Sequence, residues 1–357
     1  MKTKDFAYIK LYTQIREKIM NGVYRHGDKL PSKRTLAEEM GSSVITVEHA
    51  YSILCDEGYI ESRQRSGYFV VYTDKSCFPV SNLPKYKAVP NQAHHNTFED
   101  FPFSVFSKTI RRVLSEYGDS LLVKSPNYGC RELREAVSAY LARSRGVKVK
   151  PSNIIIGAGA EYLYGLIVQV LGRDRIYGLE SPSYDKIKKV YSANGVVCDM
   201  LEMGADGIRT EELERTKATV LHITPFNSFP SGITASASKR REYIRWVEAR
   251  DAIIIEDDFD SEFSRFTKTE DTVFSLEQQG RTIYMNTFSK TIAPSIRIGY
   301  MVLPDSLLEA FAERAGFYSC TVPALEQYVI AELINGGDFE RHINRIRRKR
   351  RESRQNR

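Results

Sequence analysis

A lysine that follows a predicted strand, with two hydroxyls and an arginine close to it in sequence, is the most chemically informative feature of this chain. Lys290 comes shortly after the apolar run Thr282–Met285, which has the character of a buried strand. A lysine amine forms a Schiff base with an aldehyde, and the hydroxyls of Thr287 and Ser289 can hold a phosphate together with Arg297. Pyridoxal 5′-phosphate (PLP) requires these groups, so the segment predicts a PLP site with Lys290 as its catalytic residue.

Glycines and acids after other predicted strands could complete such a site. The strand Ile154–Ile156 is followed by Gly157–Glu161 and a helix pattern, an order that presents free backbone N–H groups and a positive helix end to a phosphate. The strand Ala252–Ile255 is followed by Asp257 and Asp258, and a carboxylate there can keep a pyridine nitrogen protonated. The spacing does not choose between the two aspartates.

Strand and helix patterns alternate from Phe98 onward, which is typical of a layered α/β sheet. In such a sheet the carboxyl ends of the strands lie at one edge, so the polar clusters should meet there. The predicted divisions of the chain are a first domain at residues 1–72, a linker at 73–96, a sheet domain at 97–340 and a basic segment at 341–357.

Residues 8–72 carry an unrelated pattern. Helical spacing of apolar residues covers 8–19, 33–40 and 44–57, and strand patterns cover 59–62 and 67–72. Ser32 and Ser43 can cap the second and third helices. This order predicts a winged helix-turn-helix whose third helix enters the DNA major groove. Its outer side would present Ser43, Ile45, Thr46 and His49.

The same module resembles GntR-type DNA-binding domains in the segments Gly27–Ala37, Thr46–Tyr51 and Glu57–Ile60. The resemblance implies that Arg34 contacts a phosphate or a base edge, and that Gly67 lets the wing approach DNA closely. It also implies DNA contacts from Ser32, Ser43 and Thr46. Val44 departs from the family pattern, which often has an arginine there, so the resemblance predicts DNA binding rather than a particular operator. A winged helix that contacts only proteins is the alternative, which the basic residues at Arg34 and the wing tip disfavour.

The sheet domain resembles the effector domain of MocR/GabR-type transcriptional regulators in the segments Tyr177–Gly195, Thr224–Gly232, Ile253–Phe263 and Thr287–Pro304. The resemblance implies a three-layer α/β/α PLP-dependent transferase domain of aminotransferase fold type I. In it, Lys290 forms the Schiff base, Asp257 pairs with the pyridinium and Tyr184 stacks on the ring face. The remaining implied cofactor contacts are Thr287, Ser289, Arg297 and the amides of Ala160 and Glu161 at the phosphate, and Asn227 facing the 3′-oxygen.

Two positions and the end of the chain differ from the family. Phe259 replaces a tyrosine that donates to the 3′-oxygen, and Lys186 replaces an arginine that GABA-responsive members use for the effector carboxylate. Both changes argue against a GABA effector and efficient transamination. The resemblance implies a small C-terminal domain beyond this point, and we expect only its start within the 357 residues. We interpret the basic segment His342–Arg351 as the start of the helix leading to it, with a nucleic-acid arm as the alternative.

Composition adds limits on location and partners. The 357 residues are 42% hydrophobic and 27% charged, as expected for two or three soluble domains, and no apolar run approaches the roughly 20 residues of a membrane helix. The net charge of +7 is concentrated in residues 341–357, which hold nine Lys/Arg and one Glu, so it does not by itself indicate DNA binding. Scattered cysteines fit reduced thiols, and His94 and His95 lack further metal ligands. We expect a cytoplasmic protein without a metal site.

Together these patterns predict a PLP-dependent, DNA-binding transcriptional regulator of the GntR/MocR type. It would sense PLP or a small amino compound through Lys290. Because the aminotransferase fold is usually dimeric, we expect a homodimer on a double-stranded DNA operator with paired half-sites. The alternative is a catalytically active PLP-dependent aminotransferase with an accessory DNA-binding domain. A weaker alternative is a simple repressor with a decayed effector domain.

Overall fold

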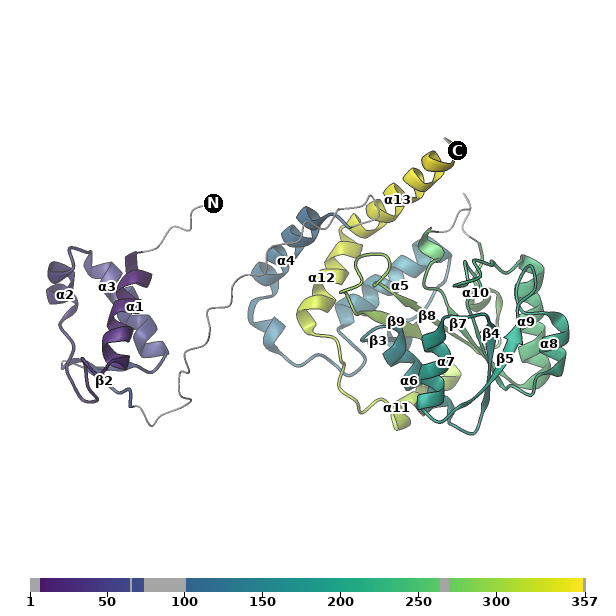
Figure 1. The fold of residues 1–357 in the computed structure, drawn as a ribbon, viewed down its shortest axis with the longest axis horizontal. Coiled ribbons are helices and arrows are strands. Elements are labelled where there is room, and N and C mark those ends of the chain that lie inside the picture. The colour runs from purple at the N-terminus through teal and green to yellow at the C-terminus, as the bar shows by residue number, and fades with distance from the viewer. Residues whose placement is uncertain (1–6, 65, 74–100, 264–269, 356–357) are drawn as a thin grey trace. The chain divides into compact units, whose positions relative to one another are not determined.

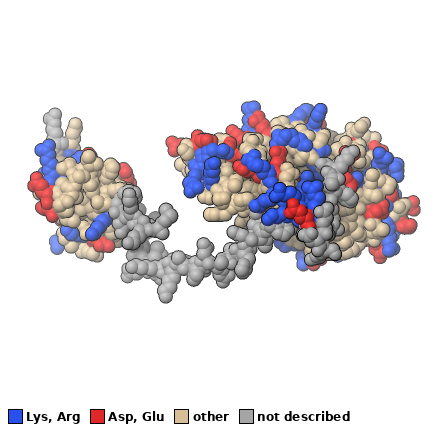
Figure 2. Space-filling model, turned by 90° about the horizontal axis from the view of Figure 1, so that it is seen from above, with Lys and Arg blue, Asp and Glu red and all other residues tan. Residues whose placement is uncertain are grey.

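The computed structural model describes residues 7–64, 66–73, 101–263 and 270–355. The chain forms two compact units, Met1–Ala93 and His94–Arg357 (Figure 1). Apart from residue 73, the predicted linker at 73–96, with its two histidines, lies outside the described residues. Acidic and basic side chains are interspersed over the visible face of each unit (Figure 2). Within the described residues, no helix combines the length and the apolar character needed to cross a bilayer.

The smaller unit is a winged helix, as predicted. Its elements are α1 (Ala7–Met20), α2 (Lys33–Glu39), α3 (Val44–Asp56), β1 (Ile60–Arg63) and β2 (Gly67–Val70). The hydroxyls of Ser32 and Ser43 accept the backbone N–H groups of Thr35 and Thr46 at 3.1 Å each, and so cap α2 and α3. The two strands pair antiparallel and form the wing.

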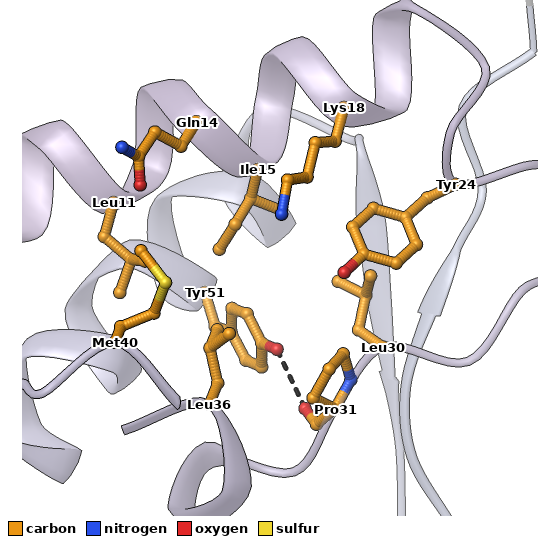
Figure 3. Close-up of a pocket in the computed structure, with 10 residues that line it drawn as sticks. All are labelled: Leu11, Gln14, Ile15, Lys18, Tyr24, Leu30, Pro31, Leu36, Met40 and Tyr51. Atoms are coloured by element: carbon orange, nitrogen blue, oxygen red, sulfur yellow. Dashed lines mark hydrogen bonds between the residues drawn. The ribbon is translucent and has the colours of Figure 1, made fainter. Parts of the chain in front are cut away.

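One apolar core holds the three helices of this unit together. The predicted inner stripe of α3 is buried against α1 and α2: Val47, Ala50, Tyr51 and Leu54. The Tyr51 hydroxyl donates to the Pro31 carbonyl at 2.8 Å and ties α3 to the turn before α2 (Figure 3). The cavity that Tyr51 helps to line has a volume of about 20 Å³, enough for roughly one water molecule. It is too small for an effector.

The larger unit is built around a sheet of seven strands (Figure 1). In spatial order these are β3 (Ile154–Gly157), β9 (Gly299–Val302), β8 (Thr282–Thr287), β7 (Ile253–Asp257), β6 (Val220–Ile223), β4 (Ile176–Ser181) and β5 (Val197–Glu202). β9 is antiparallel to both of its neighbours, and every other pairing in the sheet is parallel. The carboxyl ends of β3, β4, β6, β7 and β8 therefore share one edge, where ligands collect in α/β sheets.

Helices cover both faces of this sheet and confirm the predicted three-layer α/β/α architecture. They are α4 (Phe103–Tyr117), α5 (Arg131–Arg145), α6 (Ala160–Leu171), α7 (Asp185–Ala193), α8 (Thr210–Arg215), α9 (Ala237–Arg250), α10 (Val273–Leu276), α11 (Leu308–Arg314), α12 (Ala324–Asn335) and α13 (Asp338–Gln355). Short 3₁₀ turns occupy Gly118–Leu122, Pro151–Asn153, Ser261–Phe263 and Asp305–Leu307. Ile154 and Ile156 pack with α5 and α12, whereas Ile155 between them packs with α6 and α7, as the alternation of a strand requires.

The basic segment near the end of the chain begins inside α13, and the expected boundary between residues 340 and 341 falls within this helix. The first half of α13 is amphipathic. Phe339, Ile343 and Ile346 are buried in the same core cluster as Tyr140 and Phe288. This half therefore belongs to the core of the larger unit.

The larger unit buries several carboxyl groups. Burial raises the pKa of Glu256 to about 8, with the nearby Asp258 charge as a further cause. Burial likewise raises the pKa of Glu180 to about 7. A carboxyl with a higher pKa in the folded state binds more protons when folded than when unfolded. Its contribution to stability is therefore full at low pH and is lost as the pH rises through the folded-state value.

We predict that the thermal midpoint of the larger unit falls as the pH rises from about 5 to about 8. One such carboxyl contributes a slope of at most about 1.4 kcal/mol per pH unit. Glu256→Gln keeps one acceptor oxygen for the Val273 and Phe274 amides and removes the titration, so its pH dependence should be shallower. Circular dichroism melts of both proteins test this; a wild-type midpoint that rises over this range would contradict it.

Candidate functional site

The site is assembled where β9 lies between β3 and β8. Gly299 of β9 pairs with Gly157 of β3 on one side and with Thr287 of β8 on the other. A Cβ atom at Gly299 would lie 3.1 Å from the Asn286 carbonyl oxygen and 3.4 Å from the carbonyl carbon of Gly159. Glycine therefore lets the segment after β3 pass close to the segment after β8.

The start of α6 and the loop after β8 form an anion-binding cradle. Gly159 caps α6 with φ +87 and no side-chain cap, so the first N–H groups of the helix have no acceptor within the helix. A Cβ atom on Gly159 would lie 2.9 Å from Arg297 Nη2. The Thr287 and Ser289 hydroxyl oxygens are 3.1 Å apart, and Arg297 Nη1 is 3.5 Å from Ser289 Oγ. Two hydroxyls, a guanidinium and a helix N-terminus thus lie close together, which is the chemistry a phosphate needs.

Glu161, in the first turn of α6, joins two cations at this cradle. Its carboxylate oxygens lie 2.6 Å from Arg297 Nη2 and 2.7 Å from Lys186 Nζ. The hydrogen bond from Lys186, and then the Arg297 charge, lower the pKa of Glu161 despite some opposing burial. A phosphate at Arg297 would share that guanidinium with Glu161, and Lys186 is already paired.

The two adjacent aspartates at the end of β7, Asp257 and Asp258, have different partners. Asp258 faces α5, where Oδ2 accepts from Arg145 at 2.5 Å and from the Tyr284 hydroxyl at 2.7 Å. Both members of this ion pair are buried, with side chains 7% and 0% exposed. Burial alone would lower the pKa of Arg145, but Asp258 raises it above its ordinary value. Asp258 therefore has a structural partner on the far side of the sheet from α6.

Asp257 ends β7 and faces the layer of α6. Its Oδ2 accepts from the Tyr164 hydroxyl and lies 3.7 Å from His222 Nε2. Its Oδ1 has no hydrogen-bond partner among the described residues, and no described Lys or Arg pairs with the carboxylate. Asp258 Oδ1 also lacks a hydrogen bond, but Arg145 already balances that charge. Asp257 is therefore the carboxylate that suits a protonated pyridine nitrogen.

Lys290 lies beside a buried acid. Its Nζ is 2.8 Å from Asp260 Oδ1 and 5.0 Å from the centroid of the Phe259 ring. The Lys290 side chain is 41% exposed and that of Asp260 is 3% exposed, so the amine is accessible while its counter-charge is fixed. The Asn227 side-chain amide donates to the other oxygen of Asp260. Asp260 thereby brings Asn227 and Lys290 together.

Tyr184 precedes α7 and is partly exposed, at 38%. Its ring meets Phe229 edge to face, with the centroids 6.2 Å apart, and Lys186 Nζ lies 5.9 Å from its centroid. These contacts link it to the Lys186 end of the cradle.

Sequence reasoning missed Tyr164, His222 and Asp260. Tyr164 lies four residues after Ala160, so helical spacing could have indicated it as a neighbour of the helix start. His222 lies one residue before the end of β6, the strand beside β7, and its position is evident once the strand order is known. Asp260 lies just beyond Asp257 in sequence, and no pattern separates it from an ordinary turn acid.

The residues expected to contact DNA lie in the smaller unit. Ser32 and Ser43 are helix caps whose hydroxyls also meet Thr35 and Thr46, and Arg34 is exposed on α2. The other expected residue, Gly67 (φ +111), begins β2, and a Cβ atom there would lie 3.1 Å from the Lys29 side chain. The wing therefore passes close to an exposed lysine.

We predict different stability effects at the adjacent aspartates. Asp258→Asn removes the counter-charge of a buried arginine and should lower the free energy of unfolding of the larger unit by about 3–5 kcal/mol. Asp257→Asn removes a carboxylate without a described Lys or Arg partner. It should change the free energy of unfolding by less than about 1 kcal/mol. Urea denaturation followed by circular dichroism measures both. Equal losses in the two variants would show that the carboxylates share one structural role.

Comparison with known proteins agrees with this architecture. The family of bacterial regulatory proteins called gntR matches residues 7–70, and aminotransferase class I and II matches residues 96–356. The HTH-type transcriptional regulator YdeL of Bacillus subtilis (strain 168) is 35% identical over 352 residues, which cover 96% of this chain and 76% of YdeL. The HTH-type pyridoxine biosynthesis transcriptional regulator PdxR of Corynebacterium glutamicum is 29% identical over 352 residues, covering 95% of this chain and 75% of PdxR.

A solved structure of an archaeal alanine:glyoxylate aminotransferase is similar to the larger unit, with a TM-score of 0.63 and 25% sequence identity. The match covers 68% of this chain and 62% of the archaeal chain, so this chain spans less than two thirds of that enzyme. The winged helix and the α/β/α sheet are the folds expected of the two matched families, and the matches extend along nearly the whole chain. The chain therefore belongs to the MocR-type family of transcriptional regulators, in which a GntR-family DNA-binding domain is joined to an aminotransferase class I and II domain.

Proposed function

We propose that this regulator carries PLP on Lys290 and that its control of DNA binding responds to PLP itself or to a small amino compound. The observation that carries the proposal is the grouping of an accessible lysine, an anion cradle and a buried carboxylate with an orphaned oxygen at one sheet edge. The name of its relative PdxR, a pyridoxine biosynthesis regulator, supports a link to vitamin B6. When bound, PLP supplies an aldehyde that exchanges one amine for another.

The proposed contacts follow from the chemistry of each side chain. The phosphate is held by two hydroxyls, a guanidinium and a helix N-terminus. These groups belong to Thr287 and Ser289, to Arg297, and to the backbone N–H groups of Ala160 and Glu161. Asp257 pairs with the pyridine nitrogen, because its free oxygen and buried setting favour a protonated partner. Tyr184 covers the ring face, and Asn227 lies toward the 3′-oxygen.

Two features favour sensing over sustained transamination. Phe259 supplies no hydroxyl beside Lys290, and Asp260 keeps an anion 2.8 Å from the Lys290 amine. The Lys290 amine is thus engaged in an ion pair that attachment of PLP has to break, and the 3′-oxygen has one hydroxyl donor fewer than the family pattern provides. A homodimer that presents two winged helices to paired half-sites completes the proposal.

We predict that Gly159→Ala weakens PLP binding by about 10- to 100-fold. The new methyl group would lie 2.9 Å from Arg297 Nη2, at a backbone φ of +87 that alanine rarely adopts, so it disturbs the guanidinium and the helix start together. Gly165→Ala is the matched control, because it lies in the same helix and its Cβ would meet nothing closer than 3.9 Å. Fluorescence titration with PLP measures both affinities. Equal affinities in the two variants would exclude this cradle as the phosphate site.

We predict that Lys290→Ala retains DNA binding but loses its response to ligand. The substitution removes the amine that joins PLP while leaving the winged helix unchanged. Retention of a promoter fragment from the protein's own locus, measured with and without PLP and a panel of amino compounds, checks this. A Lys290→Ala protein whose DNA binding still responds like the parent would contradict the proposal. Sustained turnover of amino donors with 2-oxo acids by the parent would favour the enzyme instead.

A further inference from the structure

The recognition helix of the smaller unit begins with two exposed apolar side chains. Val44 and Ile45, the first residues of α3, are 42% and 67% exposed. Single exposed apolar residues are common on protein surfaces. These two occupy the end of the helix that faces base edges in helix-turn-helix proteins.

The polar groups of this first turn are used within the protein. The Ser43 hydroxyl accepts the Thr46 amide at 3.1 Å and lies 2.9 Å from the Thr46 hydroxyl. Val47 is completely buried. Glu48, in the next turn, is paired with Lys33 at 2.5 Å.

The first turn therefore lacks the side chains that recognise purines through paired hydrogen bonds. Arginine or lysine reads guanine in this way, and asparagine or glutamine reads adenine. The sequence from Val44 to Val47 contains none of the four. The side chains that project from its start are hydrocarbon.

The major groove offers one hydrocarbon group to such side chains, the 5-methyl group of thymine. Exposed cations of the smaller unit can bind phosphates: Lys29 beside the wing, Arg34 on α2, and Arg63 on β1, which also pairs with Glu61 at 2.5 Å. From this combination of an apolar helix tip and phosphate-binding cations in the same unit, we infer that Val44 and Ile45 recognise thymine methyl groups in each operator half-site. The inference rests on the DNA-binding part of the proposed function. It adds that the group recognised on the DNA is the 5-methyl group of thymine.

The test compares thymine with uracil, which pairs identically with adenine and differs by that methyl group. The full chain first selects duplexes from a random library. The selected duplex is then resynthesised with deoxyuridine in place of thymidine at one position at a time, and binding is measured by fluorescence anisotropy. We expect one or two positions in each half-site at which the wild-type chain binds about fourfold more weakly for each methyl removed.

Variants of the chain test whether Val44 and Ile45 cause the weaker binding to deoxyuridine. Ile45→Ala and Val44→Ala should bind thymidine and deoxyuridine duplexes equally at the position that each side chain reads. Val23→Ala, which shortens a side chain that is 64% exposed and outside α3, should keep the wild-type preference for the methyl group. Because all three side chains are exposed, the substitutions should leave the fold intact, which circular dichroism verifies.

Two results would overturn the inference while leaving DNA binding in place. One is wild-type binding that is unaffected by deoxyuridine at every position. The other is a methyl preference that survives in both α3 variants, which would assign the readout to another element. Failure to enrich any duplex would instead contradict DNA binding itself, and with it the inference. If the chain then captured only proteins through Val44 and Ile45, the apolar tip would be a protein contact.

Discussion

The candidate site depends on the close passage of three backbone segments around Gly299. This residue pairs with Gly157 and Thr287 at once, and the space beside it leaves no room for a larger side chain without movement of the Asn286 carbonyl. Because of this packing, the start of α6 lies against Arg297, and Lys290 emerges from the next loop. The strand register thus brings the loop after β8, which carries Lys290 and Arg297, against the start of α6. The same sheet directs Asp257 and Asp258, at the end of β7, toward opposite layers of helices, because adjacent strand residues point to opposite faces.

In the larger unit, Asp257 is a buried carboxylate that keeps a free oxygen and has no described Lys or Arg partner. Asp258 is balanced by Arg145, and Asp260 by Lys290. Asp257 receives only the Tyr164 hydroxyl, with His222 at 3.7 Å. A buried carboxylate in that state favours a ligand that brings a proton or a positive charge. The cradle shows the opposite preference, because Arg297 and the start of α6 favour an anion. A ligand with a phosphate at one end and a basic ring nitrogen at the other matches both.

Local signals in the sequence are sufficient for several of the elements. Ser32 and Ser43 were expected as caps and are caps, because capping depends on residues within one turn. The choice between Asp257 and Asp258 was open from spacing, because adjacent strand residues point to opposite layers and the sequence does not say which layer holds the ligand. The bridge from Glu161 to Arg297 joins residues 136 positions apart, and the pairing of Lys290 with Asp260 depends on two loops meeting. Such long-range pairs follow from strand order, which spacing along the chain does not encode.

The most direct test of this account is the site at which PLP becomes attached. The purified chain is incubated with PLP, reduced with borohydride and digested, and the peptides are examined by mass spectrometry. We expect a single phosphopyridoxyl group, on the peptide that contains Lys290. Attachment at Lys290 would be contradicted by a reduced protein without the adduct. A label spread over surface lysines with no preference for Lys290 would contradict it equally.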